Sequence, residues 1–291
     1  MIDLLKPFIL RFVLVIGFVS GATAFAQDEK KDEEEKEVVP IFPDKNLEKA
    51  VRKFVFEKRY NDEPIGAEDV KDLSTIKGVN MGIKDLTGLE HCRSLASIDL
   101  AHNAIVDLAP IANLKRLQYL DISDNNISEI ETLSTIPRLQ YIELSTNAVS
   151  DISPLAGLTN LNSLYLSHNR IKNIDPVVKL PKLWSLYLDN NRLENLHGVH
   201  NLGRLSTLSV RNNHVEDISP LFGLTDLYFL FLENNDIEDL SALCKIVERD
   251  SKGERRFSPY LKVYVKGNPL NYSARRGQVD HIKNCGTKVF F

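Results

Sequence analysis

Asparagine recurs every 22 residues at seven positions of this chain, and apolar residues repeat in step with it. The seven are Asn103, Asn125, Asn147, Asn169, Asn191, Asn213 and Asn235. Just before Asn169, Leu164 and Leu166 alternate with other residues, which predicts a short strand with one buried face. One such coil cannot bury its own apolar face. The pattern therefore predicts a stack of coils that stabilise one another.

The repeated asparagine suits the turn that follows each strand. Its side-chain amide both donates and accepts hydrogen bonds, so it can satisfy backbone groups where the chain leaves the sheet. We expect the seven asparagines to form an internal ladder with a structural role.

The pattern weakens before Asn103, where a stack of repeats needs a cap. Met81 occupies the position of the repeated asparagine, which indicates a degenerate first coil. Earlier in the chain, Asp44 can cap a helix whose apolar face begins at Leu47 and follows helical spacing. A second short helix is expected at 67–73, and the two helices would cover the open end of the first coil.

The pattern also changes toward the C-terminus. Asn268 lies 33 residues after Asn235, which corresponds to one repeat of 22 plus an insertion of 11. The insertion falls within 247–260, is highly charged, and is expected to extend a helix or form a surface loop. The segments 272–284 and 287–291 would then cover the last coil.

The repeat is similar to the L-x-x-L-x-L-x-x-N-x-L pattern of leucine-rich repeats. Several further phrases resemble internalin-type members of that family, and they lie at 42–51, 151–155, 217–221, 267–270 and 286–289. The resemblance covers residues 42–291. It implies an α/β solenoid of horseshoe form, with short parallel strands on the concave face and 3₁₀ or irregular chain on the convex side. It also implies a helical N-terminal cap, a mixed C-terminal cap, and a protein-binding role at the cell surface or in the envelope.

The expected organisation follows from these patterns. It consists of a signal peptide at 1–26, an acidic flexible tether at 27–41, a helical N-terminal cap at 42–75, leucine-rich repeats at 76–248 (a degenerate first coil and seven full repeats), and the insertion, last coil and C-terminal cap at 249–291.

Residues 1–26 have the features of a secretory signal peptide. Lys6 and Arg11 give a positive start, an apolar run follows, and the A-F-A sequence at 24–26 fits the small-x-small rule for cleavage after Ala26. The alternative is an uncleaved anchor, but the apolar run is shorter than the roughly 20 residues of a spanning helix. We therefore expect a secreted, periplasmic or envelope protein with no membrane span in the mature chain.

Charge and motifs argue against nucleic-acid binding and catalysis. The net charge is −4, which is unlike the strongly basic footprint of a nucleic-acid binder. Phosphate-binding, zinc-protease and serine-hydrolase motifs are absent from the sequence. Three weaker matches fall on repeat positions or lack companion residues: Ser74 with Lys77, Asp121 with Ser123 and Asn125, and His197 with His200. We predict no enzyme activity, no cofactor and no metal.

Three cysteines remain in a compartment expected to be oxidising. Cys92 stands in an apolar column of the repeat, so it is interpreted as a small buried hydrophobe. Cys244 ends the last full coil and Cys285 lies in the closing cap. A bridge between Cys244 and Cys285 would fasten the cap to the solenoid. Two free thiols are the alternative, and the sequence leaves both open.

Side chains that alternate with the buried strand residues point out of the concave face, where folding does not require aromatic rings. The predicted partner-binding residues are Tyr119, Tyr141, Tyr165, Trp184, Tyr187, Phe229 and Phe231, with the acids Asp99, Asp121 and Glu143. Exposed aromatic clusters mark protein interfaces, and the acids would complement a basic segment of the partner. The competing interpretation is that the rings only pack as cross-strand neighbours.

Two other functions stay open at the level of sequence. A glycan or cell-wall ligand would stack on flat, exposed rings beside polar groups, which Tyr165, Trp184, Tyr187, Asp189 and Asn190 could supply. A purely structural envelope role needs no ligand. Our leading prediction is a monomeric, non-catalytic module that binds a protein partner.

Overall fold

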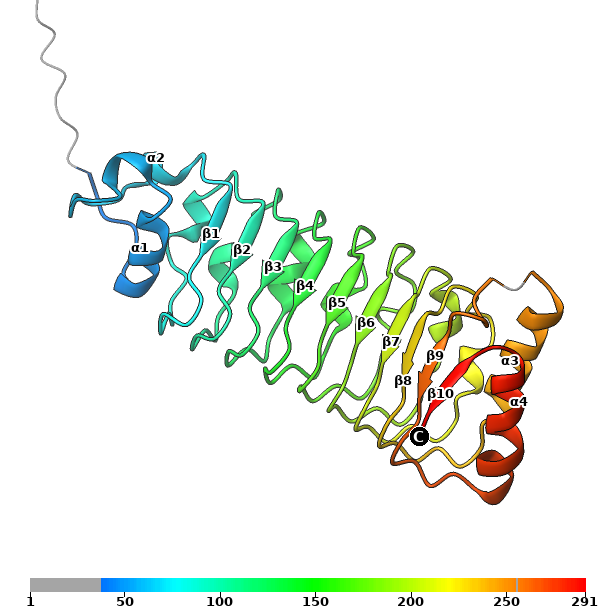
Figure 1. Ribbon diagram of the computed structural model, residues 1–291. Helices are drawn as coiled ribbons and strands as arrows, with labels where there is room; N and C mark the ends of the chain where they lie inside the picture. The colour runs from blue at the N-terminus through cyan, green and yellow to red at the C-terminus, as the bar shows by residue number, and fades with distance from the viewer. Residues whose placement is uncertain (1–37, 255) are drawn as a thin grey trace, which may run out of the picture. The chain divides into compact units, whose positions relative to one another are not determined.

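Ten short parallel strands form one continuous sheet in the order of the sequence (Figure 1). The computed structural model describes residues 38–254 and 256–291. The strands are β1 (Thr75–Lys77), β2 (Ser97–Asp99), β3 (Tyr119–Asp121), β4 (Tyr141–Glu143), β5 (Ser163–Tyr165), β6 (Ser185–Tyr187), β7 (Thr207–Ser209), β8 (Phe229–Phe231), β9 (Lys262–Tyr264) and β10 (Lys288–Phe290). Equivalent residues pair in register, as Leu164 does with Leu186. The predicted α/β solenoid with parallel strands is confirmed.

The predicted signal peptide at 1–26, its cleavage after Ala26 and most of the tether lie outside the described residues. At the end of the tether, the Ile41 N–H already donates to the Ile65 carbonyl, so the chain joins the cap there. Within the described part of the chain, no helix has the length and apolar character needed to cross a membrane.

Short 3₁₀ helices carry the chain back behind most of the strands. They are η2 (Leu89–His91), η3 (Ala109–Ile111), η4 (Glu131–Thr135), η5 (Ser153–Leu155), η6 (Val199–Asn201) and η7 (Ser219–Leu221), whereas η1 (Phe56–Lys58) lies before the first strand, in the N-terminal cap. The D-I-S-P-L phrase explains η5: the Asp151 carboxylate accepts from the Ser153 N–H at 2.8 Å, and Pro154 fits the first helical turn. The convex side is therefore mostly 3₁₀ and irregular chain.

The asparagine side chains bridge consecutive coils. The Asn169 amide Nδ2 donates to the carbonyls of Leu144 and Leu166, both at 3.0 Å, and its Oδ1 accepts from the Val149 N–H at 2.9 Å. Equivalent contacts recur at the other six positions and again at Asn268. Each amide satisfies backbone groups of its own coil and of the preceding one, behind a fully buried row of Leu, Ile and Val side chains.

Two helices, α1 (Lys45–Arg52) and α2 (Ala67–Val70), cover the N-terminal end. Asp44 caps α1 by accepting from the N–H groups of Asn46 and Leu47, and its second oxygen accepts from those of Lys84 and Asp85 in the first coil. One carboxylate thus fixes both the start of the helix and its position on the repeats. Gly78 leaves room for the helix, since a Cβ there would lie 2.9 Å from the Ala50 Cβ.

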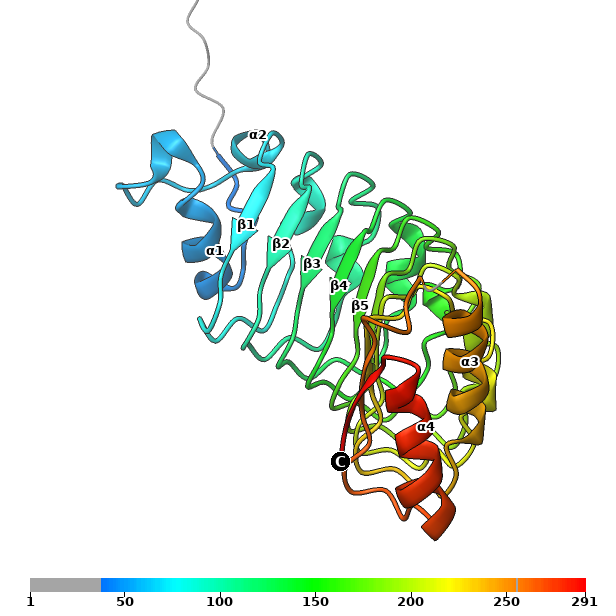
Figure 2. The same ribbon diagram turned by 45° about the vertical axis from the view of Figure 1, so that its right-hand side comes forward.

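The C-terminal cap contains α3 (Ser241–Lys252), the π-helical segment Ala274–Gln278 and α4 (Val279–Asn284). The helices α3 and α4 pack side by side at the end of the sheet (Figure 2). The insertion is a helix extension followed by a loop, and the Asp250 carboxylate holds that loop by accepting from the Phe257 and Ser258 N–H groups. The last residues do more than cover the end, because β10 extends the sheet by one strand.

Candidate functional site: the concave face

Four tyrosines on adjacent strands form a continuous row of contacting rings, stacked in the first and last pairs and tilted in the middle pair, which we call the tyrosine ladder. Its members are Tyr119, Tyr141, Tyr165 and Tyr187. Their ring centroids lie 4.5, 5.2 and 4.9 Å apart in sequence order, close to the strand spacing of about 4.8 Å. All four rings are half-buried. Burial is the largest cause that raises the pKa of each phenol, so these groups remain neutral donors near pH 7.

A second stacked row, the C-terminal aromatic ladder, consists of Phe229, Phe231, Tyr264 and Phe290 on β8 to β10. The Phe231 and Tyr264 centroids lie 4.8 Å apart, and those of Tyr264 and Phe290 lie 4.5 Å apart. Neither Tyr264 nor Phe290 was among the predicted partner residues, and Phe290 lies on a strand that was not expected. The alternation of Lys288, Val289 and Phe290 was the available signal, but three residues at a chain end are too few to predict a strand.

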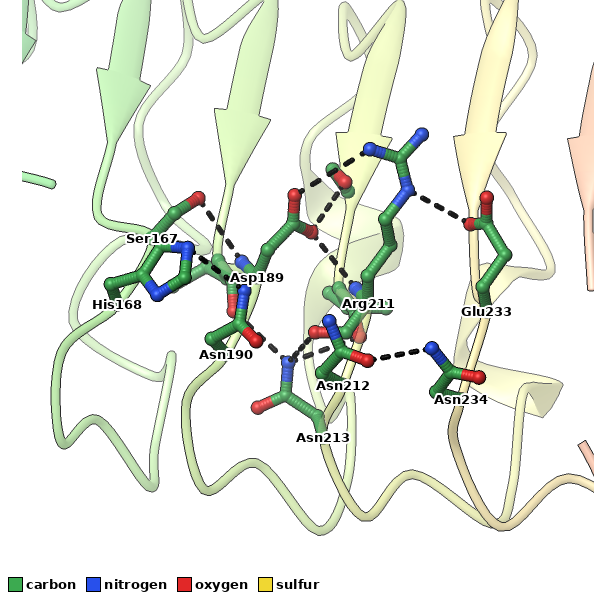
Figure 3. Close-up of polar contacts among 12 residues, drawn as sticks. Ser167, His168, Asp189, Asn190, Arg211, Asn212, Asn213, Glu233 and Asn234 are labelled. Carbon is green, nitrogen blue, oxygen red and sulfur yellow. Dashed lines mark hydrogen bonds and ion pairs between the residues drawn. The ribbon is translucent and has the colours of Figure 1, made fainter. Parts of the chain in front are cut away.

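A polar network separates the two ladders at the ends of strands β6 to β8 (Figure 3). The small residues Thr207 and Ser209 of β7 are buried, which interrupts the aromatic rows. The Asp189 carboxylate accepts from the Ser209 hydroxyl and from the Arg211 N–H, and the Arg211 guanidinium donates to Glu233 at 3.0 Å. The same guanidinium lies 4.0 Å from the centre of the Phe231 ring. Arg211 was not among the predicted partner-binding residues.

The three predicted acids line the same column at the N-terminal end of the face. The β-sheet register pairs Asp99 with Asp121 and Asp121 with Glu143. Asp99 also pairs with Lys77 at 3.0 Å, while its other oxygen is shielded from solvent and has no hydrogen-bond partner in the described structure. Burial raises the pKa of Glu143, although it accepts from the Ser145 N–H at 2.8 Å.

Trp184 lies apart from the two ladders. It precedes β6 and lines a groove at the edge where the strands begin, with 58% of its surface exposed. The predicted partner residues therefore divide into a concave set, which the sheet brings together, and one tryptophan at the rim.

All three cysteines are free thiols. Burial raises the pKa of Cys92 to about 12 and that of Cys244 to about 11. The Cys244 thiol lies 3.6 Å from the Gln278 carbonyl oxygen, and Cys285 is half-buried in the cap. Of the two alternatives that the sequence left open at Cys244 and Cys285, the structure has the unbridged one.

The weaker motifs have structural explanations. Lys77 pairs with Asp99 across β1 and β2, and the Asp121 carboxylate accepts from Ser123. Both His197 and His200 are exposed. Across residues 38–254 and 256–291, no group of three or more His, Cys, Asp or Glu side chains is arranged to hold a metal ion.

Stacked parallel strands, 3₁₀ connections and an asparagine ladder define a leucine-rich-repeat protein. The family model "Leucine Rich repeats (2 copies)" matches residues 115–157, 159–199 and 204–245. A crystal structure of internalin C2 from Listeria monocytogenes is 32% identical, covers 71% of this chain and 91% of that chain, and has a TM-score of 0.68. The chain belongs to the internalin-like family of leucine-rich-repeat proteins.

Two more distant structures share the fold alone. A leucine-rich-repeat protein from Leptospira interrogans is 20% identical, with 70% of this chain and 56% of that chain covered and a TM-score of 0.52. The ectodomain of a plant membrane receptor kinase from Arabidopsis thaliana, in complex with Casparian strip integrity factor 2, is 19% identical, with 62% and 22% covered and a TM-score of 0.52. No curated protein matches the chain in sequence.

Proposed function

We propose that this chain is a non-catalytic binding module that engages a protein partner through its concave face. The observation that carries the proposal is the tyrosine ladder, a row of half-buried rings on the face of the sheet that does not contribute to the hydrophobic core. The buried face of the same strands is already filled, since Leu164 and Leu186 are fully buried. Tyrosines are enriched among the residues that dominate protein interfaces.

Stacking makes this surface rigid before a partner arrives. Each ring is held by its neighbours, and the coils that carry the rings are held by the asparagine ladder. A preorganised surface loses little conformational entropy on binding, which favours affinity. Simple cross-strand packing would produce the same stacking, so the two interpretations differ only in whether a partner uses the exposed ring edges.

The acid column supports a basic segment as the partner's contact. Asp99, Asp121 and Glu143 are consecutive in register, and Asp99 retains an acceptor oxygen without a hydrogen-bond partner in the described structure. A lysine or arginine of the partner would pair with the partly exposed carboxylates of this column, and its charge would favour the ionised form of Glu143 against the effect of burial. Electrostatic complementarity of this kind contributes mainly to association rate and specificity.

The related fold of the plant receptor ectodomain, solved with a bound factor, agrees with a binding role. Given the leader predicted at 1–26, we propose that the chain acts outside the cytoplasm, in the periplasm, the envelope or the medium. We also propose that the mature chain is a monomer. The ladder argues against the concave tyrosines as a sugar platform, because Tyr165 and Tyr187 stack on each other and cover the ring faces that a sugar would need.

An affinity capture from envelope extract tests the proposal. The baits are the full chain, the double variant Tyr165→Ala with Tyr187→Ala, and the control Tyr272→Ala, which removes an exposed ring on the C-terminal cap. We expect one protein to be retained by the full chain and the control and lost with the double variant. Calorimetry with that purified protein should show binding weakened by about 30-fold or more, the scale of an interface hot spot.

The variants must first have circular dichroism spectra and unfolding transitions close to those of the parent chain. Equal retention of every captured protein by the folded double variant would refute the concave interface. A second variant pair, Asp121→Asn with Glu143→Gln, should slow association more than it speeds dissociation.

A further inference from the structure

A groove of about 750 Å³ runs along the edge where strands β5 to β8 begin. We call it the Trp184 groove, and define it by Lys182, Trp184, Arg204, Ser206, Tyr228 and Arg256. Its volume lies within the range of about 300–1,000 Å³ that is typical of ligand sites. The proposed concave interface does not use it.

Two exposed rings flank the middle of the groove. Trp184, Ser206 and Tyr228 occupy the same position in successive coils, since Ser206 N–H donates to the Trp184 carbonyl and Tyr228 N–H to that of Ser206. The backbone positions that carry the two rings are thus two strand spacings apart, about 9–10 Å, with a small buried serine between them. Tyr228 is held by stacking on Tyr260, at 6.1 Å between centroids. The arrangement provides two aromatic walls and a polar floor.

Lysine and arginine side chains line the same edge of the sheet, at one equivalent position in several of the coils. Lys182 and Arg204 stand two residues before Trp184 and Ser206, are exposed, and form no ion pair within residues 38–254 and 256–291. Arg116 and Arg138 occupy the equivalent position in earlier coils and are also exposed. The edge is therefore positive, in contrast to the acidic column of the concave face.

The chemistry of the groove favours one class of ligand. A peptide that binds by adding a strand would need unpaired strand backbone, but β5 to β8 are paired on both sides. The hydroxyl of Ser163 and the amide of Asn162 also line the groove and suit a ligand rich in hydroxyls, while the Asp226 carboxylate is paired with Arg256 at 2.8 Å. The cations are spread along the edge and do not converge on one point. They therefore suit a polymeric ligand that carries one negative charge on each of its repeating units.

We propose that the Trp184 groove binds an acidic oligosaccharide that carries a carboxylate on successive sugar units. The sugar rings would pack against Trp184 and Tyr228, and the carboxylates would pair with Lys182 and Arg204. This site is separate from the concave face, so the chain would hold a protein and an acidic glycan on different surfaces.

Trp184 is the only tryptophan in the chain, so its fluorescence reports directly on the groove. The full chain is titrated with a hexamer of galacturonic acid, with the neutral hexamer of glucose and with a hexamer of glutamate. We expect a saturable change in emission with hexagalacturonate, and binding of the neutral sugar and of the peptide weaker by about tenfold or more. Raising the salt concentration should weaken the hexagalacturonate binding.

Variants locate the site. Arg204→Gln and Tyr228→Ala keep the tryptophan, and each should weaken binding by about tenfold. Arg170→Gln removes an exposed arginine elsewhere and should leave binding unchanged, as should the concave double variant Tyr165→Ala with Tyr187→Ala. The absence of a saturable change at millimolar hexagalacturonate, equal binding of hexaglutamate, or unchanged binding by folded Arg204→Gln would each overturn the proposal.

Discussion

Replacing Asn169 by alanine tests the physical account of the repeat. The side chain is almost fully buried and makes four hydrogen bonds to backbone groups, three through Nδ2 and one through Oδ1. In the variant, the Leu144 and Leu166 carbonyls keep one amide partner each, from Asn147 and Asn191. The Val149 N–H keeps none, so the main cost is one buried donor without a partner.

The expected magnitude follows from that inventory. An orphaned buried donor costs about 1–3 kcal/mol, and the bonds lost from Nδ2 add about 0.5–1.5 kcal/mol each at most. We expect Asn169→Ala to lower the free energy of unfolding by about 2–5 kcal/mol, which corresponds to a fall in Tm of about 5–15 °C in a chain of this size. Asn169→Asp should be at least as harmful near pH 7, because a carboxylate cannot donate to the carbonyls of Leu144 and Leu166.

Urea unfolding followed by circular dichroism measures the loss. The control is Asn126→Ala, an exposed asparagine next to the ladder that should change stability by less than about 0.5 kcal/mol. The m value is compared as well, since a repeat array can lose its cooperativity. If Asn169→Ala unfolds within about 0.5 kcal/mol of the parent with the same m value, the ladder does not hold the coils together as described.

Three further substitutions test the N-terminal cap and the acid column. Burial would raise the pKa of Asp44, but four backbone N–H donors outweigh it and lower the pKa below 3.8. The stability that Asp44 contributes is therefore present above that value and is lost as the pH falls through the folded pKa. Asp44→Ala should lower the free energy of unfolding in urea by about 1–3 kcal/mol at pH 7 and by less in acid. An equal loss at both pH values would contradict this. Burial raises the pKa of Glu143, so the stability of the parent chain falls as the pH rises from 4.5 through the folded pKa. The Glu143→Gln variant cannot ionise there, so its Tm should rise relative to that of the parent over this pH range in a series of thermal melts. Gly78→Ala places a Cβ 2.9 Å from the Ala50 side chain and should lower stability by about 1–3 kcal/mol in thermal unfolding, and an unchanged Tm would mean that α1 can shift at no cost.

Much of the fold could be predicted because the repeat is a local rule applied many times. The spacing of Asn169 and Leu164 sets which side chains face the core, and the same rule fixes the strand register. The strand at Lys288–Phe290 could not be predicted in the same way. Three residues carry little periodicity, and they become a strand only because β9 offers an unpaired edge beside them.

The candidate site was predicted unevenly. The concave columns followed from alternation, but the sequence could not say that the Tyr141 and Tyr165 rings, which belong to two different columns, approach to 5.2 Å. It also grouped Trp184 with the concave aromatics, although the strand start places that ring on the rim. Rotamers and the width of a neighbouring side chain decide such contacts, and neither is periodic.

The sequence by itself determined the class of fold, the direction in which each strand residue points, and the structural role of the repeated asparagine, because these depend on spacing along the chain. The tertiary structure decided what lies between coils. It places Arg211 between Asp189 and Glu233, keeps Cys244 as a free thiol, and opens a groove over Ser206. These features depend on side chains that are 22 or more residues apart and meet only after the coils have stacked.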